Sequence, residues 1–257
     1  MVTAQNISYK AGARYLLEDV SLRFDTGRLN LIVGANGAGK STLIKILSGQ
    51  LTPHKGEVYY GTSAIRDVDL RALAKIRGVL SQTLEVTFPV KVWEVVMMGR
   101  YPHITGAHEE KDERAIEESM KFFDVSEWAD RDYTTLSGGE KQRVHFARVM
   151  AQVWYPVEGL GRYLYLDEPL TFLDIYYQFR LMGQLSDLLR SQDFTIIGVV
   201  HDLNLAARFA DSITVLSNGK LLATGSPSEV LTPDIIFNAF GLKPKVSMLN
   251  GKPYIQF

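Results

Sequence analysis

Hydrophobic residues in the N-terminal part of the chain alternate with polar ones or run continuously over strand-length segments. These patterns predict β-strands over Thr3–Tyr9, Tyr15–Phe24 and Leu29–Val33. Gly12 and the Asp25–Gly27 turn separate the strands. The first part of the chain is therefore expected to be mainly β.

After Val33 the pattern changes to alternating helix and strand. A glycine-rich turn leads into helical apolar spacing over Ser41–Leu47. Two apolar strands are predicted later, over Tyr163–Leu166 and Thr195–Val200, and each follows a helix-like stretch. Asn218-Gly219 predicts a hairpin turn within Ser212–Leu222. This order is typical of an α/β protein with a parallel sheet.

A helical region interrupts this order. Glu109–Trp128 is rich in charge, and Ile116, Met120 and Phe123 repeat at helix spacing. The pattern predicts a mainly helical subdomain inserted into an α/β core. We expect a single domain over residues 1–257, with the core at about 1–82 and 160–257 and the helical subdomain at about 83–159.

Composition narrows the possible functions. The 257 residues are 46% hydrophobic and 22% charged, as in an ordinary globular protein with a sizeable core. A net charge of -1 offers no support for nucleic-acid binding, and the absence of cysteine excludes disulfides and thiolate metal sites. The first residues do not have the pattern of a signal peptide, and no apolar run approaches the ~20 residues that cross a bilayer. Any membrane role would therefore depend on a partner.

The segment Gly34–Ser41 fits the pattern G-x-x-x-x-G-K-[ST] of a phosphate-binding loop. Glycines let backbone N–H groups approach phosphates, and the following helix directs its positive end at the same anion. Lys40 can neutralise the β- and γ-phosphates, and the Ser41 hydroxyl can bind Mg²⁺. A chance glycine turn is the alternative, but a strand is predicted before the loop and a helix after it. The sequence therefore predicts a site for a nucleoside triphosphate.

Three chemically active side chains follow the two later strands. Asp167 and Glu168 end one strand, at the sheet edge where such folds bind their ligands. Asp167 can hold Mg²⁺, and Glu168 can orient or deprotonate the attacking water. His201 ends the other strand, where it can reach a γ-phosphate oxygen or the water. Taken alone, an Asp-Glu pair or a histidine at a strand end is more often structural.

The segment Leu136–Glu140, followed by Lys141-Gln142-Arg143, resembles the signature motif of ABC ATPases. Its Ser-Gly-Gly turn at a helix start offers N–H donors, a hydroxyl and a helix dipole to an anion. Ser137 and Glu140 also fit a capping box, and both roles are compatible. In this family the motif completes the ATP site of the opposite subunit. The resemblance therefore implies a head-to-tail homodimer that encloses two ATP molecules.

The resemblance covers essentially the whole chain and implies the fold and the site. The fold is the P-loop NTPase core of ABC ATPases, a mixed β-sheet with flanking helices, an inserted helical subdomain and an N-terminal antiparallel β part. The implied catalytic residues are Glu168, His201, Gln82 and Lys40, and the implied Mg²⁺ ligands are Ser41, Gln82 and Asp167. The implied ATP contacts are Tyr9, Gly34, Asn36, Gly37, Ala38, Gly39, Lys40, Ser41 and Thr42, with Ser137, Gly138, Gly139, Glu140 and Asp174 at the shared side of the site.

Two positions in this assignment are open. Tyr9 matches the aromatic residue that stacks on adenine, but Tyr15 is a competing candidate. The loop that crosses the dimer interface usually reads Ser-Ala-Leu-Asp in this family, whereas this chain has Thr171-Phe172-Leu173-Asp174. The bulky Phe172 puts the packing of that loop in question, while Asp174 is retained.

Other stretches are similar to importers in particular. Phe88–Val96 and Gly99–His103 are similar to importers of iron chelates, heme and cobalamin. Ala151–Pro156, together with extra residues up to Arg162, is similar to heme importers, and His201–Arg208 continues that resemblance. The resemblance implies heme as cargo, with a ferric siderophore or cobalamin as the alternative. It also implies membrane permease subunits, an indirect substrate-binding protein and a peripheral place on the cytoplasmic face of the bacterial inner membrane. A single-core iron-sulfur assembly ATPase is the rival from another class.

Overall fold

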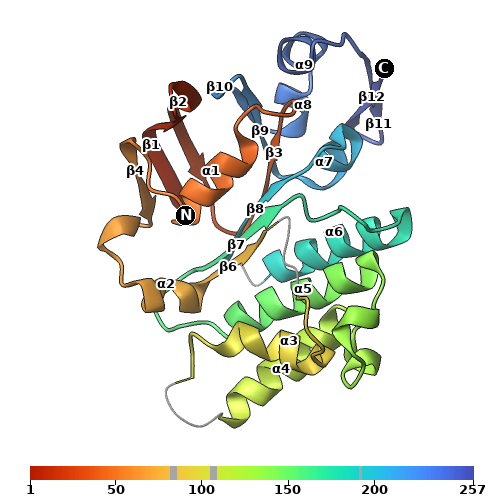
Figure 1. The fold of residues 1–257 in the computed structure, drawn as a ribbon. Coiled ribbons are helices and arrows are strands. Elements are labelled where there is room, and N and C mark those ends of the chain that lie inside the picture. Colours follow the sequence, from red (N-terminus) through yellow and green to blue (C-terminus); the bar gives the residue numbers. More distant parts are fainter. Residues whose placement is uncertain (82–85, 105–108, 191–192) are drawn as a thin grey trace.

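The apolar segments of the chain form two main β-sheets that share one hydrophobic cluster. A computed structural model describes residues 1–81, 86–104, 109–190 and 193–257. Within these ranges the larger sheet has the order β10-β9-β3-β8-β7-β6, and only the β9–β10 pair is antiparallel. Its strands are β10 (Lys220–Gly225), β9 (Ser212–Ser217), β3 (Leu29–Val33), β8 (Phe194–Val199), β7 (Arg162–Asp167) and β6 (Arg77–Leu80). The α/β prediction with a parallel sheet is confirmed (Figure 1).

The N-terminal sheet is antiparallel, as the resemblance to ABC ATPases implied. Its order is β2-β1-β4-β5, and Figure 1 shows it beside α1. The strands are β2 (Arg14–Phe24), β1 (Val2–Ala11), β4 (Lys55–Tyr60) and β5 (Ser63–Ala64). The sequence did not predict β4 or β5, since both are short and carry few of the apolar positions that define a strand pattern.

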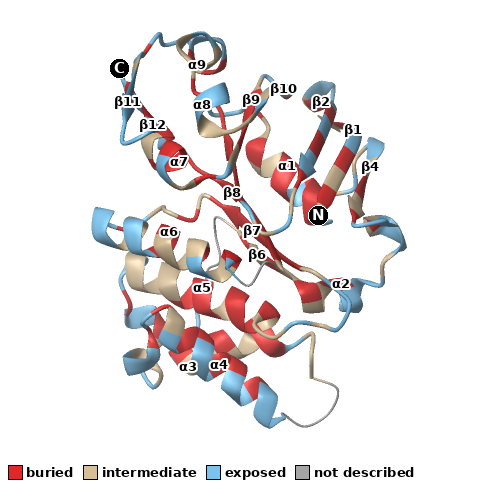
Figure 2. Cartoon of the chain, turned by 180° about the vertical axis from the view of Figure 1, so that it is seen from behind, coloured by how far each residue is buried: buried red, intermediate tan, exposed pale blue. Residues whose placement is uncertain are grey.

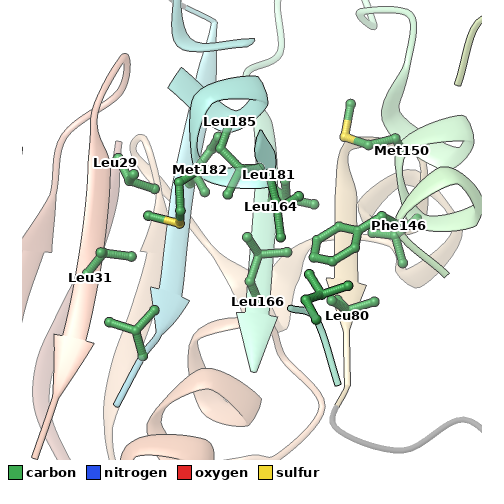
Figure 3. Packing of buried hydrophobic residues seen from close by; sticks show 14 of the residues in the cluster. Leu29, Leu31, Leu80, Phe146, Met150, Leu164, Leu166, Leu181, Met182 and Leu185 are labelled. Carbon is green, nitrogen blue, oxygen red and sulfur yellow. The ribbon is translucent and has the colours of Figure 1, made fainter. Parts of the chain in front are cut away.

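Successive residues of the parallel strands point to opposite faces of the large sheet, so each face has its own core. On β7, Leu164 and Leu166 belong to one cluster, and Tyr163 and Tyr165 belong to the other. Figure 3 shows the first cluster, in which the β3, β6 and β7 leucines meet side chains of the helices α5 and α6. The second cluster includes the apolar residues of α1 and of the N-terminal sheet. The sheet is therefore covered on both faces, which explains the continuous apolar runs of its strands.

Helices lie on both sides of this sheet, and α3, α4, α5 and α6 group together on one side of the molecule (Figure 1, Figure 2). Figure 2 shows that α4 has an exposed outer side, while α5 is buried along much of its length. The helices are α1 (Lys40–Leu47), α2 (Leu70–Ile76), α3 (Val92–Met97), α4 (Glu110–Phe122), α5 (Gly138–Val153), α6 (Ile175–Leu189), α7 (Leu203–Phe209), α8 (Pro227–Val230) and α9 (Pro233–Phe240), with short 3-10 helices at Ile65–Asp67, Met98–Arg100, Ser126–Trp128 and Tyr133–Thr135.

The described chain between β6 and β7 is helical, but its longest predicted helix is shorter than expected. The sequence predicted a helix over Glu109–Trp128, whereas α4 ends at Phe122. Asp124 has a φ of 54°, which is incompatible with a continuing right-handed helix. The charged and apolar spacing continues past this point, so the pattern alone could not locate the break.

The C-terminal end of α5 is fastened to the core sheet by Gln152. Its amide Nε2 donates hydrogen bonds to the carbonyl oxygens of Ala74 and Arg77, at 2.7 and 2.9 Å. Its own carbonyl oxygen lies 2.7 Å from Nε2 of His103. One residue therefore joins α5, the junction of α2 with β6, and the segment after α3.

A buried ion pair holds the same segment to α4. The guanidinium of Arg100 contacts the carboxylate of Asp112 at 2.8 Å, and Nη1 of Arg100 also donates to the carbonyl of Ala151. Both charged side chains are at most 5% exposed. Because each charge is buried, its partner is essential to its stability.

The last two strands of the structure form a hairpin that the sequence did not predict. Strands β11 (Lys245–Leu249) and β12 (Lys252–Gln256) are antiparallel, and β12 packs beside α7. Asn204 fixes it there: its Nδ2 donates to the carbonyl of Ile255 at 3.1 Å, and its Oδ1 accepts from the Ile255 N–H at 2.8 Å. The Asn204 side chain thus makes the two backbone hydrogen bonds at Ile255 that a neighbouring strand would otherwise make.

Within the described ranges, no helix combines the length and apolarity that crossing a lipid bilayer requires.

Candidate nucleotide site

Two glycines of the phosphate loop, Gly34 and Gly39, are required because of their positive φ angles and the close approach of neighbouring strands. The loop joins β3 to α1, and Gly39, the N-cap of α1, has a φ of 101°. A Cβ at Gly39 would lie 2.5 Å from the carbonyl oxygen of Leu16, and one at Gly34 would lie 2.3 Å from that of Leu216. Neither position can carry a side chain without moving the backbone of a neighbouring strand. The loop is therefore held against β2 and β9 in one conformation.

Lys40 lies along this loop rather than away from it. Its Nζ donates hydrogen bonds to the carbonyl oxygens of Gly34 and Ala35, at 2.9 and 3.0 Å. Burial lowers the pKa of Lys40, while the charges of Glu168 and Asp167 act in the opposite direction. Because the Lys40 cation is buried at the loop, a polyanionic ligand bound there would be stabilised by its charge.

Asp167 and Ser41 are in contact, which brings two parts of the sequence together. The Ser41 hydroxyl donates to Oδ1 of Asp167 at 2.9 Å. Burial raises the pKa of Asp167, the Ser41 hydrogen bond lowers it, and the nearby Glu168 raises it further. A hydroxyl and a buried carboxylate are oxygen ligands of the kind Mg²⁺ prefers, so this pair fits a magnesium ion. Gln82, the third predicted ligand, lies outside the described residues.

Glu168 and His201 meet although they come from different strands. Oε1 of Glu168 and Nε2 of His201 are 2.8 Å apart, and the His201 side chain is half exposed. Glu168 has a φ of 53°, an unusual value for a residue other than glycine. Such strain at a strand end is typical of functional positions, where the turn directs a side chain into a site.

Lys40, Ser41, Glu168 and His201 line one open hollow of about 680 Å³, whereas Asp167, which contacts Ser41, is not among its lining residues. Its predicted members are Asn36, Gly37, Gly39, Lys40, Ser41, Thr42, Glu168 and His201. Leu16, which also lines it, was not predicted, because a strand leucine carries no local signal of a binding role. Gly34 and Ala38 belong to the loop without lining this hollow.

The signature residues line a different hollow, of about 400 Å³. Its lining residues are Ser137, Gly138, Gly139, Glu140, Arg143, Phe172, Leu173, Asp174 and Tyr177. No residue is common to the two hollows, so the structure does not join the phosphate loop and the signature within one chain. Within the described residues, the two motifs thus line separate hollows of the same chain.

At the start of α5 the predicted capping box is present. The Ser137 hydroxyl accepts from the Glu140 N–H at 3.4 Å, and Oε2 of Glu140 accepts from the Ser137 N–H at 2.7 Å. The first-turn N–H groups of α5 and the adjoining glycines therefore border the signature hollow. The Glu140 carboxylate accepts the Ser137 N–H within the box, and its other oxygen lies 3.8 Å from Nη1 of Arg131.

Phe172 has an unusual conformation beside the signature turn. Its φ is 66°, its side chain is 71% exposed, and its ring carbons lie 3.5 to 3.6 Å from the position of a Cβ at Gly138. The next acid, Asp174, is the N-cap of α6, where Oδ1 accepts from the Tyr177 N–H at 2.9 Å. The bulky residue therefore packs on its own chain's signature, and Asp174 keeps the following helix in place.

The two aromatic candidates for adenine lie in different surroundings. Tyr9 is partly buried, packs with the core and meets the ring of His54 edge-on at 5.0 Å. Tyr15 is 40% exposed, lies next to Leu16 in sequence, and has Nζ of Lys10 over its ring at 4.3 Å. Neither lines the phosphate hollow itself.

Comparison with known proteins decides the family. The model of the family described as ABC transporter matches residues 17–171, more than half of the chain. The chain belongs to the ABC transporter family. It is also 43% identical to the hemin import ATP-binding protein HmuV of Gloeobacter violaceus, over 96% of this chain and 89% of that protein. For HmuV of Escherichia coli O157:H7 the identity is 40%, over 94% and 92%. With its phosphate loop and signature, the chain is an ATPase of this family.

Solved structures agree on the fold. A putative metal-chelate type ABC transporter in an inward-facing conformation superposes with a TM-score of 0.81, at 23% identity, over 99% of this chain and 95% of that one. A dimeric bacterial ABC transporter cassette superposes with a TM-score of 0.76, at 28% identity, over 88% of this chain and 98% of that one. The predicted ABC ATPase fold is confirmed.

Proposed function

We propose that this chain is the ATP-hydrolysing subunit of an importer for hemin, and that it drives a separate membrane permease. The assignment of hemin as the cargo rests on the near-full-length similarity to two HmuV proteins, at 43% and 40% identity. The nucleotide chemistry has independent support, since Lys40, Asp167, Glu168 and His201 converge around the phosphate loop. We place the chain at the cytoplasmic face of the cell membrane, as a peripheral subunit.

The active form in this proposal is a head-to-tail homodimer. The separation of the two hollows on one chain supports it, since a second copy is needed to bring Ser137 and the phosphate loop to the same nucleotide. A related cassette has been solved as a dimer. Two ATP molecules would be enclosed, and ATP would favour the closed pair by binding it better than the open one.

Hydrolysis would depend on residues at the ends of β7 and β8. Lys40 neutralises charge on the β- and γ-phosphates, while the loop N–H groups hold them. Glu168 orients the attacking water and accepts its proton, and His201 fixes the Glu168 carboxylate and contacts the γ-phosphate. Mg²⁺ would be held by Ser41 and Asp167, and when bound it neutralises developing phosphate charge. Gln82 is proposed as a further ligand and sensor of this ion.

The alternatives differ in the cargo or in the class of protein. A ferric siderophore or cobalamin importer would use the same nucleotide chemistry, and the chain's own residues do not touch cargo. A single-core iron-sulfur assembly ATPase is disfavoured by the similarity to import proteins at 40% identity or more.

One reconstitution tests the cargo. The chain and its membrane partner are placed in liposomes, and ATPase activity is measured with binding proteins loaded with hemin, a ferric siderophore or cobalamin. We expect stimulation by the hemin-loaded protein only. Stimulation by one of the other carriers without a response to hemin would overturn the cargo assignment and leave the ATPase assignment intact.

A further inference from the structure

A third groove, of about 590 Å³, lies outside the two hollows of the nucleotide site. It is formed by α6, α7 and the β11–β12 hairpin, and Figure 1 shows these elements along the same side of the molecule. Its walls include Ile175 and Phe179 of α6, Leu205 and Arg208 of α7, and Leu249 and Tyr254 of the hairpin.

The rim of this groove is apolar and open to solvent. Ile175 is 75% exposed and Leu249 is 58% exposed. Tyr176 and Met248, their neighbours in sequence, are exposed as well. Clustered large apolar side chains on a protein surface usually mark a contact with another molecule.

The groove is held in a fixed shape. The two hydrogen bonds between Asn204 and the backbone of Ile255 tie β12 to α7, and Nζ of Lys252 donates to the carbonyl of Arg208. The rings of Phe179 and Phe209 pack edge to face at 5.7 Å and join α6 to α7. A preformed surface loses little conformational freedom when a partner covers it.

The position of the groove relative to the nucleotide site identifies the partner. Asp202 lines the groove and directly follows His201, which lines the phosphate hollow. Ile175 also lines the groove and directly follows Asp174, which lines the signature hollow. The groove therefore adjoins both hollows and lies between the helices that begin at them.

Symmetry then places the groove near the dimer axis. In a head-to-tail pair, the phosphate hollow of each copy faces the signature hollow of the other. The two-fold axis must therefore pass midway between the two hollows of one chain, and surfaces on this midline meet their own copies. The groove is lined by the positively charged Arg208 and Lys252 and by the negatively charged Asp202. The groove of one copy can therefore place opposite charges against the groove of another.

We propose that this groove packs against the same groove of a second copy, so that the C-terminal hairpin forms a second contact of the ATP-bound dimer. The inference rests on the head-to-tail dimer of the proposed function. It assigns a role to β11–β12, which lies beyond the residues 17–171 that match the family model.

The test uses the full chain with Glu168→Gln, which keeps bound ATP, and measures the dimer dissociation constant by sedimentation in Mg-ATP. Leu249→Asp is the test variant, because it places a charge in the apolar rim. Leu70→Asp is the matched control, since Leu70 is a similarly exposed leucine, 74% exposed, on α2 and away from the groove. We expect Leu249→Asp to raise the dissociation constant at least tenfold and Leu70→Asp to leave it within twofold.

The outcomes separate this inference from the proposed function. Absence of an ATP-dependent dimer in the parent would overturn the head-to-tail dimer itself. A dimer of unchanged affinity in Leu249→Asp would overturn only the groove contact. If Leu249→Asp does not fold, judged by thermal unfolding and by monomer ATP affinity, Leu249→Ala replaces it, with an expected rise of about threefold. An unchanged dissociation constant for Leu249→Ala would equally overturn the contact.

Discussion

Nε2 of His201 and Oε1 of Glu168 lie 2.8 Å apart, at the ends of two neighbouring parallel strands. This contact joins residues 33 positions apart in the sequence. It orients the carboxylate that we assign to the attacking water, so the two side chains are expected to act as one unit.

Glu168→Gln is expected to reduce ATP turnover by about 10²–10⁴-fold, because the amide cannot accept the proton of the water. The affinity for ATP should stay within a few-fold, since the phosphates are held by the loop and by Lys40. Steady-state hydrolysis and binding of a fluorescent ATP analogue measure the two effects. Near-normal turnover would remove Glu168 from this role.

His201→Ala is expected to reduce turnover by roughly 10²-fold, since the carboxylate of Glu168 loses its positioning partner. The decisive measurement is the double variant. If the two residues act as one unit, Glu168→Gln with His201→Ala should be about as slow as the slower single variant. Effects that multiply would show that the residues act independently.

Gly39→Ala is expected to abolish ATP binding, because the new Cβ would meet the carbonyl oxygen of Leu16 at 2.5 Å and displace the loop. The matched control is Gly12→Ala in the β1–β2 turn. Gly12 also has a positive φ, 60°, but apart from its chain neighbours no described residue has an atom within 4 Å of its Cβ position. It should lose only about 1 kcal/mol of stability and retain ATP binding, as titration calorimetry can show.

Asp112→Asn is expected to lower the free energy of unfolding by about 3 kcal/mol, because it leaves the buried guanidinium of Arg100 without its charge partner. Burial acts to raise the pKa of Asp112, but the hydrogen bonds from Arg100 and from the Glu109 N–H, together with the charge of Arg100, hold the pKa below its ordinary value.

The pH dependence follows from the direction of that shift. A carboxyl with a lowered pKa in the folded state contributes its stability above its unfolded pKa of about 3.9 and loses it as pH falls through the folded pKa. The difference in urea midpoint between wild type and Asp112→Asn should therefore be constant near neutral pH and shrink below about pH 4. A difference that grows on acidification would contradict the assignment.

Tyr15→Ala is expected to weaken ATP binding more than Tyr9→Ala, by about 1 kcal/mol or fivefold, because Tyr15 is 40% exposed and directly precedes Leu16, which lines the phosphate hollow. The ring of Tyr9 is engaged with His54. GTP and ATP affinities of both variants provide the measurement. A larger loss in Tyr9→Ala would restore the assignment of Tyr9 to adenine.

Much of the fold follows from local patterns in the sequence. Asn218 and Gly219 both have positive φ, at 50° and 77°, as the predicted hairpin turn requires. The apolar run before Asp167 is a fully buried strand, as its composition indicates. These features were predictable because the information lies within a few neighbouring residues.

Other features depend on contacts between distant residues. The β11–β12 hairpin is stabilised by Asn204, about 50 residues earlier, so its own sequence gives little sign of it. The end of α4 is set by the conformation of Asp124 rather than by any break in the helical spacing. The pairing of Glu168 with His201 and the role of Leu16 likewise appear only when the strands are assembled.

The hydrogen bonds of Gln152 to Ala74 and Arg77 fix the C-terminal end of α5, so a tilt of the helix about this end displaces its N-terminal end most. Gln152 lies near the C-terminal end of the helix, while Ser137 and the signature glycines lie at its N-terminal end, where Gly138 packs against Phe172. About 14 residues at ~1.5 Å each separate the two points, which is roughly 21 Å. A rotation of α5 by about 10° about Gln152 would therefore displace Ser137 by roughly 4 Å, which is more than the length of a hydrogen bond. In the proposed dimer, such a tilt applied near His103 and Arg100 would move the signature toward or away from the nucleotide held by the other copy.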